Sequence, residues 1–325
     1  MKRRLWILTG LVCFFVLFAL VFGWLSRIVP FVDQRQKAVW EDIYQNKNQI
    51  AYAFLGSSHV YCGIDPSVVE EMTGKRAVLV SSGVQSLTET YYNFAELLKY
   101  QTPELVFIDL YAAYRDFSVP GPGQDKKPDV NYTNIDCMRL SWNKIRMARE
   151  VFPDTFLPYA LFPLLREHSN WSNLPNVDQN IRFETEPPIY GKGFSGLDTV
   201  VSDEQYQGYL DMAENREPFA VRPADRDALK RIVTLADKRG VEVRFIMIPW
   251  LAEFTQKINY PSVVEAVNAC LAPEKMVDFQ GAPYREMGLS RDTFIADKVS
   301  DNQHLNTEGA RIFTEYLVRR EIKGE

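Results

Sequence analysis

The chain has 325 residues, of which 46% are hydrophobic and 24% charged, and its formal net charge at pH 7 is −5. This composition fits a globular protein of one large domain or two small ones. The mild negative charge, without a basic stripe, argues against a nucleic-acid-binding protein, because binding phosphates requires clustered positive charge.

The amino terminus has the pattern of a membrane anchor. A basic cluster at residues 2–4 precedes an uncharged apolar run at residues 5–25, with Trp6 and Trp24 near its ends. About 20 apolar residues suffice to span a bilayer, and Trp is enriched at membrane interfaces. Because only Arg27 follows the run closely, the charge bias places the amino terminus in the cytoplasm. A cleaved signal peptide is the alternative, but the run is long and no small-residue cleavage site follows it.

Apolar runs that alternate with helical patterns follow the anchor. Strands are expected at residues 51–55, 76–80, 105–110, 241–248 and 276–279, and helices at residues 65–73, 86–100, 141–150, 224–239, 263–271 and 306–320. Strand and helix in alternation are typical of a parallel sheet with crossover helices. The predicted fold is therefore a three-layer α/β/α domain on a mostly parallel sheet.

These patterns divide the chain into three parts. Residues 1–27 are the predicted cytoplasmic tip and single-pass anchor in the cell membrane. Residues 28–50 are mixed and polar, and we interpret them as a stalk with a short helix. Residues 51–325 form the α/β domain outside the cytoplasm. Within it, residues 116–223 are rich in Pro, Gly, Asn and aromatic side chains, which indicates an insertion over the carboxyl edge of the sheet, where binding loops gather.

Two serines follow the first strand directly, in the sequence Gly56-Ser57-Ser58, and an Asp301-x-x-His304 pattern lies near the end of the chain. Many α/β enzymes present a nucleophile at the carboxyl end of a strand. A serine nucleophile needs an imidazole to accept its proton and an acid to orient that imidazole. Ser58 is the predicted nucleophile and Ser57 the alternative. The alternative is that neither segment is catalytic and that both only cap the helices that follow them.

This pattern resembles the SGNH/GDSL hydrolase superfamily, whose Gly-Asp-Ser motif puts the nucleophile two residues after the glycine, as Ser58 is here. The resemblance implies an SGNH or flavodoxin-like fold and a triad of Ser58, Asp301 and His304. It also implies oxyanion-hole donors in the N–H groups of Ser58 and Gly83. The superfamily's third donor, an asparagine after the third strand, is missing here, and the Tyr111 hydroxyl is the expected substitute.

The departures from the superfamily pattern resemble a membrane-anchored subgroup, which includes the family of the D-alanyl-lipoteichoic-acid biosynthesis protein and relatives in exopolysaccharide acetylation. The stretch from Arg166 to Trp171 is similar to an Arg-x-His-x-x-Trp element of that subgroup. By this resemblance His168 and Trp171 line the substrate cleft. A surface or packed histidine is the alternative. His59 is given no catalytic role.

The resemblance implies a bacterial cell-surface serine esterase or O-acyltransferase that moves an acetyl or D-alanyl group to or from a cell-wall or exopolysaccharide polymer. A membrane-bound O-acyltransferase is the implied partner. The alternative is a catalytically inactive binding or scaffold partner of that acyltransferase, which the missing asparagine supports and the complete Ser, Asp and His set opposes. No metal or cofactor is expected, since no metal-ligand spacing and no glycine-rich phosphate loop occur.

Overall fold

The computed structural model describes residues 2–121, 123, 128–185, 191–211, 213, 219–273, 276–295 and 303–325. In this part of the chain, one sheet of five parallel strands has the order β2-β1-β3-β4-β5. The strands are β1 (Tyr52–Gly56), β2 (Ala77–Ser81), β3 (Leu105–Asp109), β4 (Glu242–Met247) and β5 (Val277–Asp278). All five lie at, or within two residues of, the runs expected to form strands.

The first three strands of the chain are mostly apolar because both faces of the sheet are covered there. Every residue of β1, β2 and β3 is buried, as is usual for parallel sheets between two helical layers. The register pairs Gly56 with Ser81 and Asp109 with Ile246. These strands therefore end at one common edge of the sheet.

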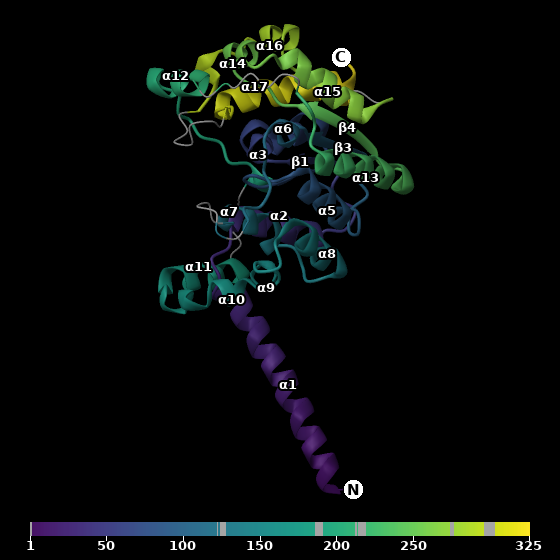
Figure 1. Cartoon of the computed structure of the whole chain (residues 1–325), viewed down its shortest axis with the longest axis vertical. Helices are drawn as coiled ribbons and strands as arrows, with labels where there is room; N and C mark the ends of the chain where they lie inside the picture. Colours follow the sequence, from purple (N-terminus) through teal and green to yellow (C-terminus); the bar gives the residue numbers. More distant parts are fainter. Residues whose placement is uncertain are drawn as a thin grey trace.

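Helices cover the two faces in the arrangement that right-handed crossovers require. The chain moves outward from β1 to β2 through α4 (Pro66–Thr73), which packs with α17 (Thr307–Leu317) on one face. It then moves in the opposite direction through α5 (Leu87–Leu97), α13 (Pro223–Arg239) and α15 (Tyr260–Leu271), which pack together on the other face. Figure 1 shows α17 and the α5–α13 pair on opposite sides of the strands. The predicted three-layer fold is confirmed.

Residues 28–50 contain a helix that belongs to the core. Helix α2 (Gln34–Gln45) begins after Asp33, whose carboxylate accepts hydrogen bonds from the first-turn N–H groups. It buries Val39, Trp40 and Ile43 and packs beside β2. The segment expected to be a stalk is therefore, along α2, part of the folded domain.

The insertion is largely helical in its described part. It contains α7 (Asp129–Asp136), α8 (Trp142–Val151), α9 (Leu157–Leu161), α10 (Pro163–Arg166), η1 (His168–Ser172), α11 (Leu174–Thr185), η2 (Gly191–Gly193) and α12 (Asp203–Asp211). Helix α8 packs on α5, while α10 and α11 contact the amino-terminal helix. Much of the insertion thus extends the α5 side of the domain toward the anchor (Figure 1).

The amino-terminal helix α1 (Lys2–Ile28) is long and apolar enough to span a membrane. Its segment Arg3–Ile28 has 26 residues with a mean hydropathy of 2.8 in the most apolar window, and that window is not buried against the rest of the protein. Figure 1 shows α1 projecting as a rod from the end of the molecule that holds α10 and α11. Its orientation across a membrane stays a prediction.

Candidate active site

The structure brings Ser58 and His304 together, although 246 residues separate them in the sequence. The Ser58 Oγ atom lies 2.8 Å from His304 Nε2, and both residues are buried. With Nε2 as the acceptor, the Ser58 hydroxyl donates this hydrogen bond, which is the contact that a general base needs to take a serine proton. Asp301, the predicted third member, lies outside the described residues.

The turn between β1 and α3 (Ser58–Gly63) presents Ser58. Ser57 caps α3 by accepting a hydrogen bond from the His59 N–H, at 3.4 Å. Ser58 is the first helical residue, so its N–H points out of the open end of the helix and has no partner within it. Gly56 has φ +154°, and an added Cβ would lie 2.8 Å from Val60 Cγ2 and 2.9 Å from the Asp109 Cβ. The tight approach to Asp109 explains the glycine before the two serines.

Hydrogen bonds on both sides hold the segment that carries His304. The Ile295 N–H donates to the His304 carbonyl at 3.0 Å, and the Leu251 N–H donates to Gln303 Oε1 at 3.1 Å. Asn306 then caps α17 by accepting from the N–H of its first turn. The histidine therefore lies at a junction between the end of β4 and the start of the last helix.

His59 is the unexpected residue of the site. Its ring is 1% exposed and stacks on Tyr111 with 3.6 Å between centroids, and it meets His304 edge-to-face at 5.1 Å. Within the described residues neither of its ring nitrogens has a hydrogen-bond partner. Burial, and then the neighbouring His304, hold the pKa of His59 well below its usual value, so the ring stays neutral. Buried nitrogens without a partner are rare and mark His59 as a candidate functional residue.

Asp109, at the end of β3, is a second buried group that the sequence did not single out. Its carboxylate accepts from the Tyr111 N–H at 3.2 Å and from the Ile248 N–H at 3.4 Å, and it lies directly under Gly56. Burial raises the pKa of Asp109 to about 7, although these N–H groups partly oppose the change. Asp109 thus ties together the strand ends beneath the Ser58 turn.

The predicted oxyanion donor Gly83 lies in a tightly held loop after β2. An added Cβ at Gly83 would lie 3.2 Å from Val130 Cγ1 and 3.9 Å from the Tyr61 hydroxyl, one helical turn beyond Ser58. Its neighbour Val84 has φ +49°, an unusual conformation for a β-branched residue and one that clusters at functional sites. Tyr111, the other expected donor, stacks on His59. The assignment of both groups as oxyanion donors stays a prediction.

A network of buried polar side chains holds the loop that carries Gly83. Ser82 hydrogen-bonds to Gln85 and Asn134, and Asn134 donates to Glu89 at 2.8 Å. Glu89 also accepts from the Ser86 N–H in a capping box at the start of α5. Burial raises the pKa of Glu89 to about 7. The loop that carries Gly83 therefore rests on a polar network rather than on apolar packing alone.

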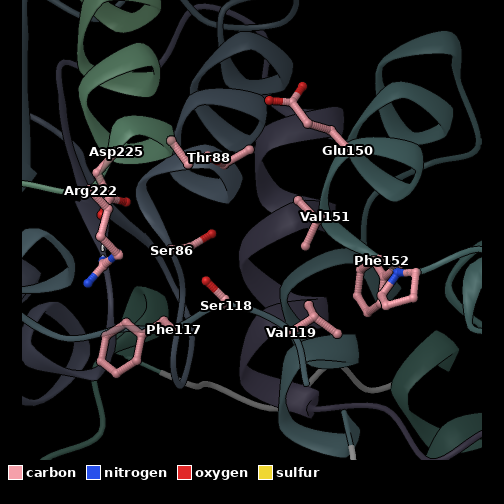
Figure 2. A pocket seen from close by; sticks show the side chains of 12 residues that line it. Ser86, Thr88, Phe117, Ser118, Val119, Glu150, Val151, Phe152, Arg222 and Asp225 are labelled. Carbon is pink, nitrogen blue, oxygen red and sulfur yellow. Dashed lines mark ion pairs between the residues drawn. The ribbon is translucent and has the colours of Figure 1, made fainter. Parts of the chain in front are cut away.

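Two adjoining cavities lie beside the Gly83 loop and share Phe117 and Ser118 in their walls. The first, of about 360 Å³, includes Val84 and Asn131. The second, of about 380 Å³, extends between α5, α8 and α13 and is drawn in Figure 2. In that view Ser118 lies between the ion pair of Arg222 with Asp225 and Val119. These cavities offer space for a ligand beside the loop that carries Gly83.

The structure places His168 and Trp171 elsewhere, in the lobe beside α1 (Figure 1). His168 Nδ1 lies 3.0 Å from the Leu165 carbonyl, and both side chains are exposed. No described contact joins either residue to Ser58 or His304. Their assignment to the substrate cleft stays a prediction. Comparison with known protein families and with curated proteins finds no match for this chain.

Proposed function

We propose that this protein is a serine esterase or O-acyltransferase that works through an acyl-Ser58 intermediate at the cell surface. The single observation that supports this most is the 2.8 Å hydrogen bond between Ser58 Oγ and His304 Nε2 at the carboxyl edge of a parallel sheet. A buried hydroxyl in contact with a buried imidazole is the arrangement that activates serine for acyl transfer.

The proposed reaction has two transfers. His304 Nε2 takes the Ser58 proton as Oγ attacks the acyl carbonyl carbon, and the donor C–O bond then breaks while the departing oxygen receives that proton. In the second transfer, His304 deprotonates an acceptor hydroxyl or water, which attacks acyl-Ser58. The Ser58 C–O bond breaks and Oγ recovers its proton. Atoms and charge balance without a cofactor.

Negative charge on the carbonyl oxygen must be stabilised in both transfers. The Ser58 N–H at the open end of α3 is the first proposed donor, and the Gly83 N–H and Tyr111 hydroxyl are the others. Asp301 is proposed to orient His304. Neutral His59, stacked beneath Tyr111, adds no positive charge that would oppose formation of the His304 imidazolium.

The resemblance to membrane-anchored SGNH-like proteins supports a glycopolymer as substrate and a membrane-bound O-acyltransferase as partner. The apolar α1 supports attachment to a membrane, and its flanking charges support a domain outside the cytoplasm. We propose that the cavities beside Gly83 receive part of the polymer, because they are the described spaces adjoining that loop.

An activated acetyl ester tests the proposal on the full chain in detergent. We expect rapid release of one leaving group per protein molecule, followed by slow turnover, with the acetyl group found on the Ser58 peptide by mass spectrometry. Ser58→Ala should abolish the burst. Ser57→Ala is the matched control, because it removes the cap of α3, costing about 1 kcal/mol of stability, and leaves the nucleophile in place. A folded wild-type protein without any burst would favour the scaffold alternative.

A further inference from the structure

Four large apolar side chains lie exposed on a short stretch of the insertion, between the end of α9 and the start of α11. They are Phe162, Leu165, Trp171 and Leu174, which are 37%, 44%, 69% and 71% exposed. We refer to these four side chains as the apolar patch. Exposed apolar groups that gather in this way mark a surface that contacts something other than water.

One contact sets the depth of the apolar patch relative to α1. Phe162 meets Phe22 edge-to-face, with 6.1 Å between ring centroids. The uncharged run between Arg4 and Arg27 has a length, at 1.5 Å per residue, close to the roughly 30 Å of a bilayer's hydrocarbon core. If that core is centred on the run, Phe22 lies about 5 Å inside its boundary. Phe162 then lies at the same level.

The charged groups of the same stretch, Arg166 and Glu167, form ion pairs and are partly buried. Arg166 forms ion pairs with Asp136 at 2.6 Å and with Glu167 at 2.9 Å, and its side chain is mostly buried. The His168 ring is engaged with the Leu165 carbonyl. Pairing of this kind lowers the penalty for bringing charge close to an apolar phase. The polar residues that are exposed in this stretch, His168, Ser169, Ser172 and Asn173, include no Asp, Glu, Lys or Arg.

Hydrogen bonds fasten this lobe to the end of α1. The Asn180 amide donates to the carbonyls of Ile28 and Pro30 at 3.0 and 2.8 Å, and Asn176 donates to the carbonyl of Val29 at 3.0 Å. Both asparagines are buried. The last carbonyls of a helix have no hydrogen-bond partner within it. Here the side chains of α11 supply the donors. The apolar patch is therefore held at a set height relative to the anchor.

We propose that the apolar patch inserts into the interface of the same bilayer that α1 spans, so that the domain is seated on the membrane instead of tethered above it. The occupant is lipid. The inference rests on α1 spanning a membrane and is independent of the chemistry of Ser58. It gives Trp171 a role in the membrane interface, where Trp is enriched, and not in a substrate cleft.

The test uses the full chain in phosphatidylcholine nanodiscs, with nitroxide labels on single added cysteines. Trp171→Cys and Leu174→Cys report the apolar patch. Arg285→Cys on α16 (Ala282–Glu286), at the far end of the molecule from α1, is the matched control (Figure 1). Cys13→Ser, Cys137→Ser and Cys270→Ser remove the native thiols that are not buried, and the parent without an added cysteine gives the background from Cys62.

We expect the labels at positions 171 and 174 to be more accessible to oxygen than to a water-soluble nickel complex, with the reverse at position 285. Equal access of the nickel complex at all three positions would overturn the proposal and favour a protein partner for the apolar patch. Acylation of Ser58 in the same nanodiscs is a separate readout, so failure of the membrane proposal and failure of the proposed function can be told apart.

Discussion

The Ser58 site and the apolar patch depart from the usual distribution of side chains in opposite directions. At the site, polar groups such as His59 and Asp109 are buried at the end of the sheet. In the apolar patch, large apolar groups such as Trp171 and Leu174 are exposed. Each arrangement is unfavourable in isolation. The comparison teaches that His59 in one region and the apolar patch in the other have surroundings within the chain that do not fully match their chemistry. This supports our two proposals, a polar substrate at the Ser58 site and lipid at the apolar patch.

The largest expected effect concerns Asp109. Burial raises the pKa of Asp109 from 3.8, its value in an unfolded chain, to about 7 in the folded protein. The folded state therefore binds this proton more tightly than the unfolded state does. The free energy of unfolding should therefore fall as the pH rises from about 4 to about 7, by roughly 4 kcal/mol from this group. Asp109→Asn should make the pH dependence shallower, whatever its effect on stability at one pH. Urea unfolding at several pH values measures this, and an unchanged slope would show that Asp109 ionises normally.

Gly56→Ala tests the close approach beneath the nucleophile. The new Cβ would lie under 3 Å from both Val60 and Asp109, at a backbone φ that favours glycine. We expect a loss of roughly 3 kcal/mol, from steric overlap and backbone strain together. Gly208→Ala in α12, where an added Cβ meets nothing within 4 Å, is the control and should be neutral or slightly stabilising. Equal thermal stability of the two variants would contradict the account of the turn.

Asn180→Ala probes the junction that seats the apolar patch. It leaves the carbonyls of Ile28, at the end of α1, and of Pro30 without this side-chain donor, and it removes the acceptor of the Gln34 amide, 2.8 Å away. We expect local opening of residues 28–36 to become easier by about 2 kcal/mol, measured as faster hydrogen exchange in nanodiscs. Gln179→Ala, on an exposed position of the same helix, is the control. If both variants exchange alike, Asn180 does not hold the junction.

The smallest expected effect separates a functional His59 from a packed one. His59→Phe keeps an aromatic ring against Tyr111 but removes two unpartnered nitrogens, so stability should not fall. If a nitrogen contacts substrate or an ordered water during the reaction, the acylation rate should fall about 10-fold, the equivalent of one hydrogen bond. His59→Gln should recover part of that rate. A His59→Phe variant as fast as wild type would make His59 a packing residue.

Much of the fold and the central pair of the site were predictable from the sequence. The strands are short apolar runs between turn residues, and Ser58 could be expected at the carboxyl edge of the sheet because it directly follows the first of them. Its pairing with His304 was expected from the resemblance that the Asp301-x-x-His304 pattern carries. The start of α17 was predictable from Asn306, a strong helix cap.

Other features depend on tertiary contacts that a single sequence does not display. Helix α2 has a largely polar sequence, which by itself indicates part of a stalk. Its four large apolar or aromatic side chains are buried only because the helix packs against β2. Asp109 lies at the carboxyl end of the predicted strand at residues 105–110, where the sequence does not show that its carboxylate is buried. Its burial arises because the ends of β1 and β4 close over it. Short helices such as α9 and α10 are stabilised by packing, not by local propensity.

The most direct test of the central claim is covalent labelling of the full chain with a fluorophosphonate, followed by mass spectrometry of wild type, Ser58→Ala and His304→Ala. We predict an adduct on Ser58 in the wild type, none in Ser58→Ala, and labelling slowed by about 10⁴-fold or more in a folded His304→Ala. A Ser58 that reacts no faster in the wild type than in His304→Ala would contradict activation by the hydrogen bond on which the proposed function depends.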